Sequence, residues 1–97
     1  MIPSSADVRF GPGGLTQVDA SLHLSTASWI QCCIYPDATP ILSVKDAHVS
    51  VAITVPDRAK VTVDDLDTAV HLAEAIADYI AELRRRLAAQ DQAADAA

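Results

Sequence analysis

Glycine is scarce in this sequence and is confined to its beginning. All three glycines lie within the first 14 residues, in the run Gly11-Pro12-Gly13-Gly14. Neither a Lys-Ser/Thr pair nor a helical pattern follows this run, so it lacks the features of a phosphate-binding loop and indicates a turn. No Gly-flanked serine has the pattern of a nucleophile elbow, and nothing else singles out a catalytic triad. The sequence therefore predicts neither a catalytic site nor a cofactor.

Positive charge and long apolar runs are also in short supply. The chain has 7 Lys and Arg against 13 Asp and Glu, a net charge of −6, which disfavours binding to nucleic acid or to anionic membranes. No apolar run approaches the roughly 18 residues of a membrane-spanning helix, and the N-terminus lacks the basic and apolar regions of a signal peptide. We therefore expect a cytoplasmic protein, and its richness in Ala, Arg and Asp is typical of a high-GC bacterium or its phage.

The two cysteines are adjacent, in the stretch "WIQCCIY" from Trp29 to Tyr35. Neighbouring residues of a strand point to opposite faces, so a bond between Cys32 and Cys33 would need a distorted ring that an extended strand excludes. The Cys-x-x-Cys spacing of redox and zinc pairs is absent, and thiols stay reduced in the cytoplasm. We predict that Cys32 is a small core residue and Cys33 a partly exposed thiol.

Residues 15–55 alternate between apolar and polar side chains, which is typical of strands with one buried face. The short connections between them favour a three- or four-stranded antiparallel meander. Residues 1–14 are expected to form an irregular lead-in with at most a short strand at Val8–Phe10. The expected strands cover about 17–24, 29–35, 41–44 and 48–55.

At residue 62 the apolar period becomes helical. Thr62-Val63-Asp64-Asp65 has the form of a capping box, with Asp in place of the longer Glu or Gln. Apolar residues then share an arc of roughly 160° as far as Leu87, and Arg84–Arg86 would lie near the negative end of the helix dipole. We predict one helix over about 63–88, followed by an Ala-rich tail at 89–97 that frays.

Together these elements predict one α+β domain over residues 15–88, a two-layer sandwich with the helix packed on one sheet face. A helix of about 26 residues is about 39 Å long, whereas strands of five to nine residues span roughly 17–30 Å. The helix should therefore extend beyond its sheet, and a second copy of the chain would cover the excess. Its apolar residues follow a heptad-like spacing: Leu66, Ala69, Ala73, Ile76, Ile80, Leu83 and Leu87.

Three possible metal ligands, His23, Cys33 and His48, fall on one sheet face by parity. Cys33 is expected opposite Ser43, with His48 beyond it on the next strand. In this register the three side chains lie about 10 Å apart, whereas zinc needs its donors within about 2.0–2.3 Å of one centre. We therefore predict no metal site within one copy of the chain.

A second group of possible ligands lies on the helix, where Asp67, His71, Glu74 and Asp78 share one face with Glu82 a turn further. Carboxylates and imidazoles at this spacing are typical of helical metal sites. This face is opposite the apolar arc, however, and one helix supplies too few converging donors. We interpret it as a solvated acidic face.

Aromatic and small side chains interrupt the polar face of the predicted sheet. Trp29, Cys33, Tyr35 and Ala52 stand among small polar residues, a composition typical of interface cores, in which Trp and Tyr often act as anchors. Alternatively, the N-terminal segment with Phe10 folds over them.

The function favoured by the sequence is that of a small non-enzymatic protein-interaction module that homodimerises and acts as a regulator, adaptor or assembly component. The alternative is an enzyme or metal-binding subunit whose site, built from His23, His48, Cys33 or the helix carboxylates, is assembled across a dimer interface. The predicted interface residues are Trp29, Cys33, Tyr35, Ile76, Ile80, Leu83 and Leu87.

Overall fold

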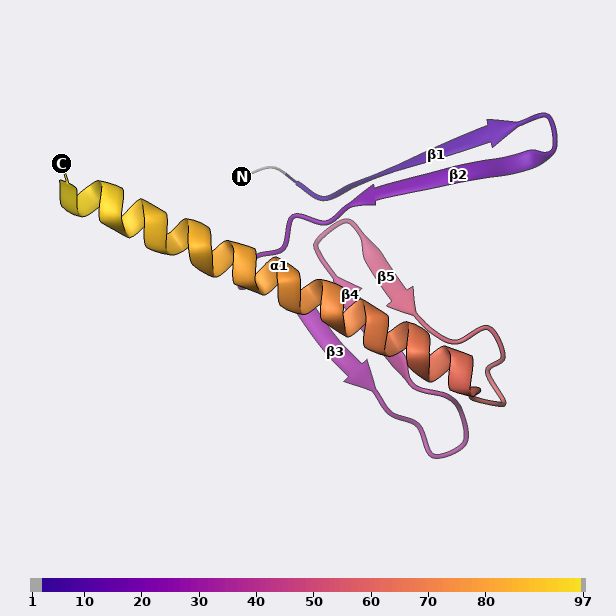
Figure 1. The fold of residues 1–97 in the computed structure, drawn as a ribbon. Coiled ribbons are helices and arrows are strands. Elements are labelled where there is room, and N and C mark those ends of the chain that lie inside the picture. Colours follow the sequence, from indigo (N-terminus) through magenta and orange to yellow (C-terminus); the bar gives the residue numbers. More distant parts are fainter. Residues whose placement is uncertain (1–2, 97) are drawn as a thin grey trace. The chain divides into compact units, whose positions relative to one another are not determined.

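In the computed structural model, which describes residues 3–96, five β-strands precede one long α-helix (Figure 1). The elements are β1 (Ser5–Gly11), β2 (Gly14–Ser21), β3 (Trp29–Cys33), β4 (Ile41–Lys45), β5 (Ser50–Ile53) and α1 (Val63–Ala96). The chain divides between Lys60 and Val61 into two compact units, one holding the strands and the other the helix. The predicted α+β fold is confirmed, and the packing of the helix on a sheet face stays a prediction.

The strands form two antiparallel sheets, the hairpin β1–β2 and a three-stranded sheet in the order β3-β4-β5. The sequence predicted instead one meander that joins β2 to β3, with at most a short strand at Val8–Phe10 before it. In the structure β2 pairs with β1, and Val8 lies opposite Val18. The segment Ala6-Asp7-Val8-Arg9-Phe10 has the same two-residue period as β2, so it supplies a partner closer in sequence than β3.

The glycine run makes the turn of this hairpin, as predicted. Gly11 pairs with Gly14 across Pro12 and Gly13. Gly14 has a φ of 103°, a left-handed conformation that a residue with a Cβ rarely adopts. The glycine at position 14 is therefore required by backbone geometry.

In the three-stranded sheet, Trp29 pairs with Lys45, Cys33 with Ile41, and Lys45 with Ser50. The predicted register between β3 and β4 was wrong by two residues, because Cys33 faces Ile41 and not Ser43. The shift of two preserves parity, so the division of side chains between the two faces is unchanged. One face carries Ile30, Cys32, Leu42, Val44, Val51 and Ile53, and the other Trp29, Gln31, Cys33, Ile41, Ser43, Lys45, Ser50 and Ala52.

The capping box at the start of α1 is present. The backbone N–H of Thr62 donates to Asp65 Oδ2 at 2.8 Å, and the backbone N–H of Asp65 donates to Thr62 Oγ1 at 3.2 Å. The shorter Asp thus performs the role usually taken by Glu. The helix continues to Ala96, beyond the predicted end at 88, because alanine has the highest intrinsic helix propensity. The last residue of the expected tail, Ala97, lies outside the described residues.

The pattern of burial is unusual, because no apolar side chain whose burial the structure describes is buried. The buried residues are polar: Ser4, Thr39 and Ser43. Cys32, expected in the core, is exposed, and Cys33 is half-buried as predicted. Both lie on β3, which has a neighbouring strand on one side only, and an edge strand covers its residues less than a central strand does.

Gly14→Ala should destabilise the hairpin by about 1–2 kcal/mol, because a Cβ penalises the left-handed conformation by that amount. Gly13→Ala is the matched control, since Gly13 has no positive φ and open space surrounds its Cβ position. Amide chemical shifts and hydrogen exchange of β1 and β2 would measure the difference. Equal effects of the two substitutions would contradict this account of the turn.

Candidate interaction surface

A long stripe of exposed apolar side chains lies on α1 and is called here the helix seam. In heptad terms, Leu66, Ala73, Ile80 and Leu87 occupy a positions, and Ala69, Ile76 and Leu83 occupy d positions. The large members are all exposed, Ile80 by 41% and Leu87 by 59%. A stripe of this spacing is the geometry by which one helix packs along another.

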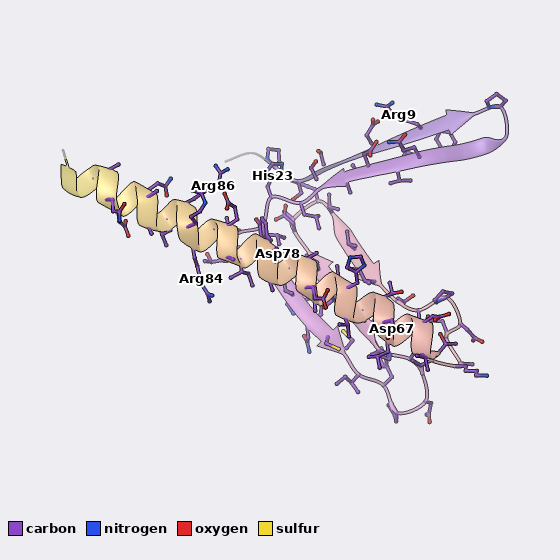
Figure 2. All side chains as sticks on the ribbon, viewed as in Figure 1. Arg9, His23, Asp67, Asp78, Arg84 and Arg86 are labelled. Carbon is purple, nitrogen blue, oxygen red and sulfur yellow. The ribbon has the colours of Figure 1, made fainter. Side chains whose placement is uncertain are left out.

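The two sides of the seam differ in chemistry. One side, the g positions, carries Asp65, Leu72, Tyr79 and Arg86, and the other side, the e positions, carries Val70, Ala77 and Arg84. Tyr79 is 64% exposed, and it was not among the predicted interface residues because only the a and d positions were considered. Figure 2 shows Arg84 and Arg86 projecting from different sides of the helix.

The sequence predicted that Arg84–Arg86 lie near the negative end of the helix dipole. The structure does not support this explanation of the three arginines. Because α1 continues to Ala96, its last turn contains no basic residue, and dipole effects fade within one turn of a helix end. Instead, Glu82 accepts hydrogen bonds from Arg85 Nη2 at 2.6 Å and Nε at 3.0 Å, and from Arg86 Nε at 2.8 Å. These bonds, from Arg85 first and then Arg86, hold the pKa of Glu82 below its ordinary value, and Glu82 raises the pKa of Arg85.

On the three-stranded sheet, the predicted interface residues Trp29 and Tyr35 are exposed, and Cys33 at the end of β3 is half-buried. Lys45, which pairs with Trp29 across β3 and β4, places its Nζ 5.1 Å from the centre of the indole ring. A cation at this distance is attracted by the ring. The predicted strand ended at residue 44, so this contact was missed.

Tyr35 also lines an open depression of about 360 Å³. Its walls come from the β3–β4 connection, the start of β4 and the segment after β5: Tyr35, Pro36, Asp37, Ala38, Ile41 and Arg58. The lining combines a phenol ring, a carboxylate and a guanidinium, groups that can contact a polar chain segment.

His23, His48 and Cys33 do not form a group that could hold a metal ion. His23 follows β2, His48 lies in the turn between β4 and β5, and Cys33 ends β3. His71 lies on α1 with Asp67 and Asp78, which Figure 2 labels. Within the described residues, no group of three His, Cys, Asp or Glu side chains is placed to hold a metal ion.

A polar junction that the sequence analysis missed is formed by Ser4, which is only 6% exposed. Its Oγ accepts a hydrogen bond from the backbone N–H of His23 at 2.9 Å. A hydrogen bond with Ser4 is also the main reason why the pKa of Asp46 is lowered, with smaller contributions from the backbone of Ala47 and the charge of His48. One hydroxyl thereby links the segment before β1 to the end of β2 and to the β4–β5 turn.

Ser4→Ala should raise the pKa of Asp46 towards its ordinary value, because the main hydrogen bond to the carboxylate is lost. A lowered pKa in the folded state contributes stability above the unfolded pKa of about 3.9, and this contribution disappears as the pH falls through the folded pKa. The substitution should therefore weaken the pH dependence of unfolding below about pH 4. Carboxyl NMR titration measures the shift, and Ser5→Ala, at an exposed neighbour, is the control that should leave it unchanged.

No described helix combines the length and apolar character that crossing a bilayer requires. Comparison with protein-family models, with curated proteins and with solved structures gives no match for the chain.

Proposed function

We propose that this chain is a small non-enzymatic protein-interaction module that homodimerises and serves as a regulator, adaptor or assembly component in the cytoplasm. The observation that carries the proposal is the absence of any buried apolar side chain among those whose burial the structure describes, although 51% of the sequence is hydrophobic. Large contiguous apolar surfaces on a folded chain mark sites of association.

The length of α1 supports a second copy as the cover for the helix seam. From Leu66 to Leu87 the seam runs for about 32 Å, at 1.5 Å per residue. Strands of four or five residues span about 13–17 Å, and three of them side by side are about 10–14 Å wide. The three-stranded sheet is therefore too small to cover the whole seam, in whatever direction a helix crosses it, whereas another copy of α1 matches it in length.

The sheet offers a smaller contact of a different kind. Trp29 and Tyr35 present amphipathic rings to the solvent, and such rings are enriched among the residues that dominate binding energy. The free thiols of Cys32 and Cys33 fit a reducing compartment. We assign self-association to the helix seam. We assign contact with a further protein to the face of the three-stranded sheet that carries Trp29.

Leu83→Asp should convert the dimer to a monomer, raising the dimer dissociation constant by at least about a hundredfold, because each copy would bring an unpaired carboxylate into the apolar contact. Sedimentation velocity over a range of concentrations measures the change. Circular dichroism must show that α1 is retained.

The matched control is Ala81→Asp, which adds the same charge two residues away at a b position outside the seam. It should leave the dissociation constant within about threefold of the parent, since exposed charges contribute little. A parent chain that remains monomeric at high concentration would contradict the proposed function.

A further inference from the structure

Resting on the proposed homodimer, we infer that two copies of α1 pair antiparallel, in the register that places Asp65 opposite the partner's Arg86. The occupant of the helix seam is then a second α1 running in the opposite direction. Both the distribution of charge along the helix and the sizes of the side chains in the seam lead to this orientation.

The charges on α1 are separated along its length. Asp64, Asp65 and Asp67 lie in the first turns, and Arg84–Arg86 lie some twenty residues later. In a parallel pair, the three arginines of one helix lie beside the three arginines of the other, and the two helix dipoles point in the same direction. Both arrangements are repulsive. An antiparallel pair brings each acidic cluster to a basic one and opposes the dipoles.

The contact between Asp65 and the partner's Arg86 is compatible with the bonds that each already makes. Asp65 accepts from Thr62 through Oδ2, and a carboxylate has a second oxygen to offer. Arg86 donates to Glu82 through Nε, and a guanidinium carries four further N–H groups. Two such pairs, one at each end of the seam, fix the register.

The same register matches large side chains to small ones. In antiparallel pairs an a residue of one helix faces a d residue of the other, so Ala73 lies opposite the partner's Ile76, and Ile80 opposite the partner's Ala69. Each alanine therefore receives an isoleucine. In a parallel pair each residue faces its own counterpart, and Ala69 and Ala73 would form two successive layers too small to fill the space between helices.

Beside the seam, this register also sets Leu72 opposite the partner's Tyr79, an apolar pair on the side where both are exposed. A parallel pair retains one attractive contact, from Arg86 to the partner's Asp91. It loses the match of alanine to isoleucine and the pairing of the acidic and basic clusters.

Distances between spin labels would determine the orientation. In a Cys32→Ser, Cys33→Ser background, single cysteines are introduced by Ala75→Cys and Ala89→Cys, both at c positions and two heptads apart. Antiparallel pairing about residue 75 brings the labels at 75 close together and separates those at 89 by about 42 Å along the axis. Electron–electron double resonance should thus give a short distance for the first and a long one for the second.

Short distances at both positions would overturn the antiparallel orientation and leave the homodimer intact. A dimer in sedimentation with long distances at both positions would overturn helix pairing and assign the contact to the sheet. A chain that is monomeric in sedimentation and shows no dipolar coupling would remove the proposed function itself, together with this inference.

The Asp65 contact has its own test, in which Arg86→Glu and Arg85→Glu change the net charge equally. Arg86 flanks the seam, whereas Arg85 occupies an f position on the opposite side. We expect Arg86→Glu to raise the dimer dissociation constant about tenfold, because two attractive pairs become repulsive, and Arg85→Glu to change it less than threefold. Equal effects would overturn the contact between Asp65 and the partner's Arg86.

Discussion

The main constraint on this structure is the small apolar surface that the short strands of the three-stranded sheet can bury. A strand of four or five residues offers two or three side chains to each face, and two of the three strands in the larger sheet are edge strands. Polar Ser43 is buried at the centre of this sheet, while the apolar residues around it are half-buried or exposed. Stability must then come from contacts that a short strand does not make within its own sheet.

The helix and the hairpin are each specified locally. The reciprocal bonds between Thr62 and Asp65 fix where α1 begins, and the left-handed Gly14 fixes where β1 returns as β2. Neither feature requires distant residues, so both can form before any tertiary contact. The side chain of Ser4 joins the N-terminal segment to the β4–β5 turn by hydrogen bonding.

Features encoded over a few residues could be predicted from the sequence, whereas pairings between distant segments could not. The cap at Thr62, the turn at Gly11–Gly14 and the opposite orientation of Cys32 and Cys33 follow from local rules. Both β1 and β3 have the alternating pattern of a possible partner for β2, and local rules do not decide between them. The prolines and glycines of residues 1–14 led to the prediction of an irregular segment where β1 lies. The end of α1 was missed because an Ala-rich tail without apolar periodicity still has high helix propensity. All the predicted interface residues are exposed except Cys33, which is half-buried, and their partner stays a prediction.

The division of five strands into two sheets has a consequence for the dynamics of the backbone. Of the described strands, β4 alone has a neighbour on each side, so its N–H and C=O groups are the best shielded from water. Every other described strand has one row of backbone groups without a neighbouring strand. Amide protons should therefore exchange slowest along β4 and fastest along the outer rows, so that the solvent reaches most of the β structure without any unfolding.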